Sequence, residues 1–558
     1  MKQILQKGSS TLEILIAFSI LALCMTAVVI VGFGNQAVSI DSQTNIEGLS
    51  YAQEMLEDAR VQADVNFLSV VSKTKTVTFG IPYVQTLAVA DITECKKQAT
   101  STVTWLSGTR PQKIELATLL TDTIGLFALG GDCAFELPLG GWTNPGSLLS
   151  RDFQKKVGDD PGVNSSAGIP ASDIDILDKR IYMTALESSK DNFYVFDASG
   201  VLSKTVPPII GSFNAGPGLN RVDVAGNYAY VANASTTSTQ SSDEFMVIDV
   251  STPSAPSVVA SIDLGIVPNC PTFCPGGAQA IYYFDGRVYV GTHRIGGEEF
   301  YVFSVSAPHS PTSPQLLGKK EINHNVSDIV VRGNYAYLAT SADTEEVIVL
   351  DVSNPTVSIP QVGAFEAKDT DGTLSDQNAT TLFLIGNKLY LGRDKVNKNA
   401  DTQRDFYVID VSNPALPVSL GSANLQYITG KNFSANVWVT GIYVVGRYGF
   451  IATNDSDPGF IVLDINNPAA LNYIKTSPLS KIISTFNYAN YNTGIDFDEG
   501  FIFTSNSQND ALRIIRPAQC ADKVDDDGDG AIDAADPQCH SDGNPSNNAS
   551  YNPEDDSE

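Results

Sequence analysis

The chain has 558 residues, which is long enough for several domains. Its formal net charge of −28 argues against nucleic acid as a partner, because phosphate recognition needs a basic surface and the sequence has no basic patch with interleaved aromatic residues.

The chain contains seven cysteines. Cys24 lies in an apolar N-terminal stretch, and the other six can be grouped by closeness in sequence. An even number of cysteines beyond such a stretch indicates disulfides formed in an oxidising compartment. The candidate pairs are Cys95 with Cys133, Cys270 with Cys274, and Cys520 with Cys539. Zinc is the alternative for Cys270 and Cys274, although no second Cys/His pair lies close to them in the sequence.

The N-terminus combines a short basic head with an apolar run. Lys2 and Lys7 precede Gly8, and residues 12–33 are apolar over about the length of a helix that spans a bilayer. Glu13 is the one charge in this run. A carboxylate in such a segment is costly, and it therefore predicts a functional role.

This pattern resembles the class III signal of type IV pilins and type II secretion pseudopilins. The resemblance implies that a prepilin peptidase removes leader residues 1–8 by cutting between Gly8 and Ser9, where the family usually has Phe after the cut. It also implies that Glu13 pairs with the N-terminal amine of a neighbouring pilin subunit, and that residues 9–60 form a transmembrane and filament-core helix. An ordinary secretory signal and a plain membrane anchor are the alternatives.

The next segments predict a small pilin-like domain. Apolar residues on one stripe of a helix over residues 34–60 are expected to pack on their own domain, and they are Ile46, Leu49, Met55, Leu56 and Ala59. Residues 61–130 contain short β-branched runs typical of strands, and they resemble the sheet of minor pilins. A loop-rich connector is expected over residues 131–170.

Residues 171–517 contain a repeat. A Gly turn between two apolar runs recurs, as at Gly226 and Gly333, and it is followed by a motif such as Asp-Val-Ser-Asn-Pro at 351–355. Successive copies of the second motif lie 47 to 59 residues apart. Four strands per period predict a propeller, here with seven blades. The units resemble the LVIVP-repeat propellers of bacterial and archaeal surface proteins.

An aspartate recurs at one position of the repeat. The copies are Asp197, Asp249, Asp351, Asp410 and Asp464. A catalytic interpretation is possible, but a residue that recurs at one position of the unit is better explained by a structural role. We expect each carboxylate to accept hydrogen bonds from backbone N–H groups of the turn that follows it.

The C-terminal segment predicts a calcium loop over residues 518–540, closed by Cys520 and Cys539. Oxygen ligands follow the spacing of an EF-hand loop, with Gly530 at its sharp bend. The candidate ligands are Asp525, Asp527, Asp529, the carbonyl of Ala531, Asp533 and Asp536. The last position has Asp where an EF-hand has Glu, as in dockerin and thrombospondin type 3 loops. Asp369 and Asp371 are a weaker calcium candidate, and residues 541–558 are expected to be a disordered acidic tail.

The sequence therefore predicts a mainly β protein with a pilin-like α-helix and small β-sheet, a seven-bladed β-propeller and a short calcium-binding tail. No catalytic residues are assigned, because the four His lie in no recognised catalytic motif. The expected function is that of a minor type IV pilin-like subunit that presents the propeller for adhesion to a surface glycan or protein. The precursor would lie in the cytoplasmic membrane and the mature subunit in an extracellular filament. A surface-anchored propeller hydrolase or lyase and a type II secretion pseudopilin are the alternatives.

Overall fold

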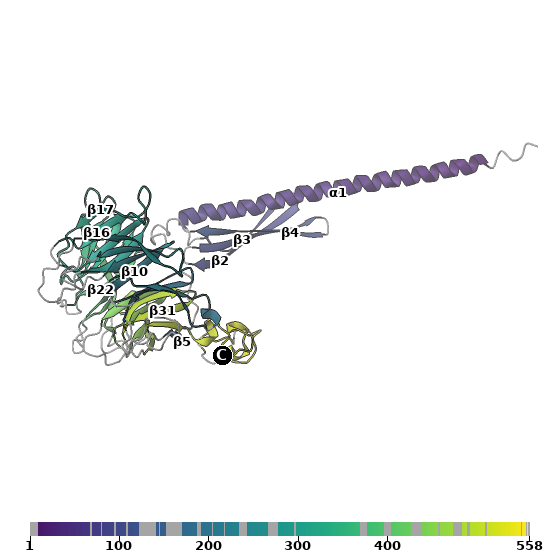
Figure 1. Ribbon diagram of the computed structural model, residues 1–558. Coiled ribbons are helices and arrows are strands. Elements are labelled where there is room, and N and C mark those ends of the chain that lie inside the picture. The colour runs from purple at the N-terminus through teal and green to yellow at the C-terminus, as the bar shows by residue number, and fades with distance from the viewer. Residues whose placement is uncertain are drawn as a thin grey trace, which may run out of the picture. The chain divides into compact units, whose positions relative to one another are not determined.

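The computed structural model is shown in Figure 1. The residues it describes are 9–66, 70–79, 81–93, 96–107, 110–121, 141–143, 145–151, 170–186, 191–203, 205–216, 218–233, 243–265, 277–294, 297–368, 377–394, 403–425, 438–455, 458–471, 482–487, 491–507, 511–547, 550–553 and 555. The chain divides into two compact units, Met1–Leu126 and Phe127–Glu558.

The first unit contains the helix α1 (Ser9–Asn66) and one antiparallel sheet. The strands are β1 (Lys73–Phe79), β2 (Ile81–Thr93), β3 (Lys96–Ser107) and β4 (Arg110–Thr121), in the order β1-β2-β3-β4. The C-terminal part of α1 lies along this sheet (Figure 1).

The stripe of α1 that contacts the sheet differs from the expected one. Met55, Leu56 and Ala59 are buried as predicted, but Ile46 and Leu49 are 66% and 39% exposed. The reason is that small residues face the sheet in this part of the helix. At Gly48 a Cβ atom would lie 2.7 Å from the Trp105 ring, so a larger side chain would displace the indole.

The first part of α1 exposes large apolar side chains, namely Leu15, Ile16, Phe18, Ile20, Leu21, Leu23 and Met25. Among the described residues, however, no helix has the length and apolarity needed to cross a membrane.

The second unit contains seven four-stranded antiparallel sheets among the described residues. Six of them have their strands in chain order, and five of these six lie in the middle of the repeat. These sheets are β10 (Leu219–Ala225), β11 (Tyr228–Asn233), β12 (Phe245–Asp249) and β13 (Ser257–Ile262); β14 (Ala278–Phe284), β15 (Arg287–Thr292), β16 (Phe300–Ser304) and β17 (Gln315–Lys320); β18 (Val326–Arg332), β19 (Tyr335–Thr340), β20 (Val347–Asp351) and β21 (Gln361–Phe365); β22 (Ala379–Ile385), β23 (Lys388–Arg393), β24 (Phe406–Asp410) and β25 (Val418–Ala423); and β26 (Val439–Val445), β27 (Tyr448–Thr453), β28 (Phe460–Asp464) and β29 (Ile482–Phe486).

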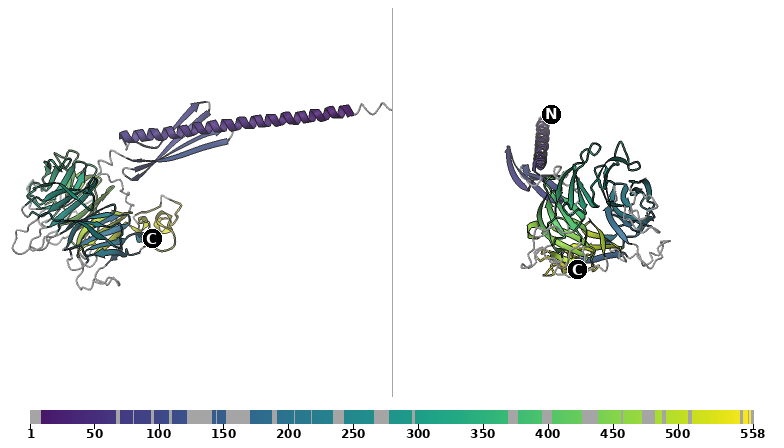
Figure 2. Two further views of the ribbon diagram at one scale, coloured as in Figure 1. Left: turned by 45° about the horizontal axis from the view of Figure 1, so that its top comes forward. Right: turned by 90° about the vertical axis from the view of Figure 1, so that its left-hand side faces the viewer.

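The first and last sheets meet. The first consists of β6 (Ala171–Leu177), β7 (Arg180–Ala185), β8 (Phe193–Asp197) and β9 (Ile209–Phe213). The last consists of β30 (Asn492–Asp498), β31 (Phe501–Asn506), β32 (Leu512–Arg516) and β5 (Gly146–Arg151). The first strand of each sheet contacts the first strand of the next, and β30 returns to β6, so these contacts form a closed series (Figure 2). The fold is therefore mainly β, with propeller-like repeats.

Strand β5 corrects the expected connector. Residues 131–170 were predicted to be loop-rich, and the repeat was predicted to begin at residue 171. The structure instead places β5 at the edge of the last sheet, where it pairs with β32. Trp142, just before β5, is fully buried, and its ring lies 4.6 Å from that of Phe450.

The repeated aspartates are turn residues, as predicted. In each case the backbone N–H two residues further on donates to the carboxylate, at distances of 2.8 to 3.0 Å. These hydrogen bonds involve Asp197, Asp249, Asp351, Asp410 and Asp464. At Asp197 and Asp249, hydrogen bonds from Ser199 and Ser251 lower the pKa of the carboxyl group.

The proline of this turn has a second role that the sequence did not indicate. Its carbonyl lies against a glycine in the fourth strand of the preceding sheet. At Gly421 a Cβ atom would lie 1.9 Å from the carbonyl oxygen of Pro468, and at Gly318 it would lie 2.2 Å from that of Pro355. Glycine is therefore required at both positions by the close approach of another backbone.

Short 3-10 helices complete the second unit. They are η2 (Val201–Ser203), η3 (Pro468–Leu471), η4 (Gln519–Ala521), η5 (Asp533–Ala535) and η6 (Pro537–Cys539). The described part of residues 541–555 folds back on this region instead of forming the expected disordered tail. Asn552 N donates to Cys539 O at 2.9 Å, and Cys520 N donates to Asp555 O at 3.1 Å.

Candidate metal centre

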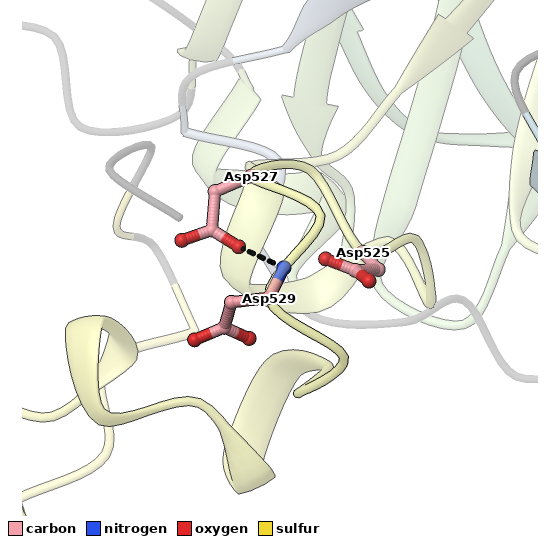
Figure 3. A group of neighbouring side chains, drawn as sticks. All are labelled: Asp525, Asp527 and Asp529. Atoms are coloured by element: carbon pink, nitrogen blue, oxygen red, sulfur yellow. Dashed lines mark hydrogen bonds between the residues drawn. The ribbon is translucent and has the colours of Figure 1, made fainter.

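Three of the predicted calcium ligands converge in the C-terminal region. One carboxylate oxygen from each of Asp525, Asp527 and Asp529 lies within 4.8 Å of the others (Figure 3). The segment that contains them is closed by a disulfide between Cys520 and Cys539, a pair proposed from the sequence. The side chains thus come from a short loop whose two ends are fixed covalently.

Backbone hydrogen bonds arrange these carboxylates. Asp525 accepts from Gly528 N at 2.7 Å and from Gly530 N at 3.0 Å. Asp529 N donates to Asp527 at 2.9 Å, and Ala531 N donates to Asp529 at 2.8 Å. Each aspartate therefore stabilises the turn that places the next one.

The two glycines are needed for backbone geometry. Gly528 has φ +81° and Gly530 has φ +92°, a region that residues with a Cβ atom rarely adopt. Neither position is crowded, since a Cβ atom there would meet nothing within 4 Å. The motif therefore uses glycine for backbone conformation here, in contrast to the crowded glycines of the sheets.

Asp533 does not join the three carboxylates. Its Oδ1 accepts from Asp522 N at 3.2 Å and from Lys523 N at 3.3 Å, which holds it against the start of the loop. Burial raises the pKa of this carboxyl group.

Asp536 is fully buried and lies at the position of the last predicted ligand. Its Oδ1 accepts from Gln538 N at 2.6 Å, and its Oδ2 has no hydrogen-bond partner among the described residues. Gln538 also donates through its side chain to Asp527, which links Asp536 to the group of three. A buried carboxylate oxygen without a partner is costly, and a bound cation would satisfy it. Hard carboxylate and carbonyl oxygens are the ligands that calcium prefers, so the donor set fits this ion.

Asp522 connects the loop to the repeat. Its side chain is buried, and its Oδ2 lies 3.6 Å from Arg516 Nε. Burial and, secondly, the nearby Asp526 carboxylate raise the pKa of Asp522 to about 8.

Several other predicted site residues lie in segments that the structure does not describe. Gly8, Cys95, Cys133, Cys270, Cys274, Asp369 and Asp371 lie outside the described residues. Ser9 is the first residue of α1, and the backbone of Glu13 belongs to the same helix, but the side chains of both lie outside the described set. Cleavage after Gly8 and charge pairing by Glu13 therefore stay predictions.

A set of carboxylates on the first strands of the sheets was missed by the sequence analysis. Asp496 Oδ2 accepts from Ile176 N at 2.7 Å, and Asp223 Oδ2 accepts from Tyr283 N at 2.6 Å. In both cases the donor belongs to the first strand of the adjacent sheet. Asp175 makes the same kind of contact with Val224 N at 2.5 Å.

Burial raises the pKa of both Asp496 and Asp223 to about 7. Burial and the Asp496 carboxylate raise the pKa of Asp175 well above its usual value. The signal in the sequence was an aspartate three residues before the turn between the first two strands. It occurs in only some units, which is why it did not stand out.

A second set of missed carboxylates precedes the third strand of four sheets. Each accepts an N–H from the residues that follow the fourth strand of its own sheet, at 2.8 to 2.9 Å. The residues are Glu244, Glu299, Glu346 and Asp405. Glu346 also forms an ion pair with Arg393 at 2.9 Å, and both side chains are fully buried. Burial raises the pKa of Glu346 to about 7.

Comparison with known proteins supports the repeat. A family model described as LVIVD repeat matches residues 219–263, 324–359, 400–424 and 437–476, so the matched repeat is LVIVD and not LVIVP. No curated protein matches the sequence. The chain is thus a repeat protein with a β-propeller-like fold.

Two solved structures show a weak likeness. BamB from Moraxella catarrhalis has 12% identity and a TM-score of 0.35, over 62% of this chain and 82% of that chain. A chain of the mitotic checkpoint complex has 9% identity and a TM-score of 0.39, over 68% of this chain and 94% of that chain.

Proposed function

We propose that the protein is a minor subunit of a type IV pilin-like surface filament and that it presents a seven-bladed β-propeller for adhesion. The observation that carries the proposal is the helix α1. It runs without interruption from Ser9, exposes large apolar side chains between Leu15 and Met25, and then packs on a four-stranded antiparallel sheet. Exposed apolar side chains on one helix favour burial against other subunits, and a filament core supplies that burial.

The propeller part of the proposal rests on the second unit. Seven four-stranded sheets contact one another through their first strands, and the last sheet takes its fourth strand from before the first. Both features favour a closed ring of seven blades, whose loops offer a rigidly held binding surface. We propose a surface glycan or protein as the ligand.

The sharpest test is N-terminal sequencing and mass measurement of the mature protein. A start at Ser9 is expected, because the leader would be removed while α1 is retained. A start beyond residue 33 would contradict the proposal, because the helix would then be absent from the mature protein.

A second test addresses assembly. The variant Glu13→Ala should be processed normally and should fail to enter filaments, as measured by immunoblotting of sheared filaments. The matched control is Asp58→Ala, which removes an exposed carboxylate from the same helix and should be incorporated normally. Normal incorporation of both variants would argue against pairing by Glu13.

Immunogold labelling at filament ends is expected for a subunit with so large a second unit, and labelling along the shaft would exclude a tip position.

We also propose that Asp525, Asp527, Asp529 and Asp536 hold calcium, with the carbonyl of Ala531 as a further ligand. The buried Oδ2 atom of Asp536 supports this assignment. Isothermal titration with calcium should give one site in the full-length chain. Asp527→Asn should lose it, and Asp343→Asn, which alters an exposed carboxylate in the loop between β19 and β20, should keep it.

A further inference from the structure

The joint between the two ends of the repeat is made by β5 and β32. Residues Gly146–Arg151 pair with Leu512–Arg516, although the two strands are separated by the whole repeat. Every other sheet of this unit is formed by four strands that follow one another in the chain. Among the described sheets of this unit, this joint is consequently the one place where a sheet can open without breaking a local hairpin.

The C-terminal segment packs on this joint. Ala518, two residues after β32, donates through its N–H to Gly141 O at 2.6 Å, shortly before β5 begins. Gly141 has φ +94°, and a Cβ atom there would lie 2.3 Å from Pro553 O and 3.0 Å from the Cβ atom of Ala521. Backbone on both sides of the candidate calcium loop therefore covers the chain that leads into β5.

Val524 anchors the same segment in the core. It is 2% exposed and belongs to a cluster that includes Ile174 of β6, Phe501 of β31 and Ile514 of β32. The cluster thus joins the first sheet, the last sheet and the C-terminal segment. Asp525, the first candidate ligand, is the residue immediately after Val524.

Carboxylates dominate the electrostatics of this segment. Asp522, Asp525, Asp527, Asp529 and Asp536 lie within one disulfide-closed loop, and Arg516 and Lys523 are the nearby cations. Mutual repulsion favours loosening of the loop, and a divalent cation would remove it. Ordering of the loop by a cation would also fix Val524 and the backbone that covers Gly141.

We infer that calcium bound at residues 525–536 fastens the joint between β5 and β32, so that closure of the repeat depends on calcium. This inference rests on the calcium site proposed above. The calcium loop then stabilises the pairing of β5 with β32. This structural role is separate from the recognition of any ligand by the propeller.

The test is hydrogen exchange measured by mass spectrometry on the full-length chain, with calcium or with a chelator. At ten times the dissociation constant, calcium should slow exchange of β5 and β32 about tenfold, because opening of the joint would release the ion. Exchange in β18–β21, away from the joint, should not change. Asp527→Asn should remove the calcium effect and Asp343→Asn should retain it.

A second variant separates binding from coupling. Val524→Ala should still bind calcium in a titration, while the effect of calcium on exchange in β5 should be much smaller. If the unaltered chain bound calcium with no change in β5 exchange, the coupling between calcium and the β5–β32 joint would be overturned, whereas the proposed calcium site would stand. A titration without calcium binding would overturn both proposals.

Discussion

Carboxylates in two regions of the second unit have different tasks. Those of Asp525, Asp527 and Asp529 accept hydrogen bonds from their own loop and converge on one point. Those of Asp223 and Asp496 accept hydrogen bonds from the adjacent sheet and so join two sheets. The partner of the carboxylate, and not the residue type, separates a candidate cation site from a structural joint. Where the N–H donors belong to the same loop, the carboxylates can also coordinate an ion. Where the donors belong to an adjacent sheet, the carboxylate connects the two sheets.

The largest effect is expected where a carboxylate and its partner are both buried and charged. Arg393→Met leaves Glu346 buried without its ion-pair partner, and the free energy of unfolding should fall by about 3–5 kcal/mol. Urea unfolding at neutral pH measures it. The double variant Glu346→Gln with Arg393→Met should recover most of the loss. Equal destabilisation in both would indicate that Arg393 acts through packing alone.

Removing a carboxylate between sheets should have a smaller effect. Asp496→Ala removes one of the two acceptors of Ile176 N, the other being Asp175 Oδ1 at 2.8 Å, and a loss of about 0.5–1.5 kcal/mol in the free energy of unfolding is expected. Asp496→Asn keeps an acceptor oxygen and is the matched control. If the free energy of unfolding of Asp496→Ala equalled that of the unaltered protein, the proposed role of Asp496 in joining two sheets would be refuted.

The pH dependence of the free energy of unfolding should reveal the buried carboxylate of Asp496 between two sheets. The pKa of Asp496 is about 7 in the folded chain and about 3.9 in the unfolded chain, so the folded state binds more protons between these values. Stability should therefore fall as pH rises from about 4 to 7 and level off above that range. Asp496→Asn should flatten this slope in thermal unfolding followed by circular dichroism. An unchanged slope would contradict the assignment.

The smallest effect is expected for the converging group. In the presence of a chelator, Asp527→Asn should change the free energy of unfolding by less than about 0.5 kcal/mol, because the side chain is exposed. Unfolding in chelator measures this directly. A large loss would show that Asp527 supports the fold without any ion, and it would erase the distinction between the two regions.

The repeat could be predicted because its signals are local. A Gly turn such as that at Gly226, or an Asp-Pro turn such as that at residues 351–355, is encoded within a few residues. The spacing of Asp525, Asp527 and Asp529 is local in the same way, and it led directly to the residues that converge.

Features that depend on distant partners could not be predicted. Strand β5 is short, lies outside the repeat and pairs with residues more than 300 positions away. Asp175 and Asp496 gain their role from N–H groups of another sheet. The stripe of α1 was misjudged at Ile46 and Leu49 because Trp105, which selects the small residues, lies on a different element.

The contact between a fourth-strand glycine and the proline of the next sheet has a consequence for how the gene can change in length. Four such pairs occur among the described residues: Gly211 with Pro253, Gly318 with Pro355, Gly363 with Pro414, and Gly421 with Pro468. Because the pairs are equivalent, recombination that removes one period between two of them brings a glycine against a new proline of the same kind. Loss or gain of whole units at these positions preserves the contact, whereas a deletion or insertion of any other length leaves a glycine without an equivalent proline.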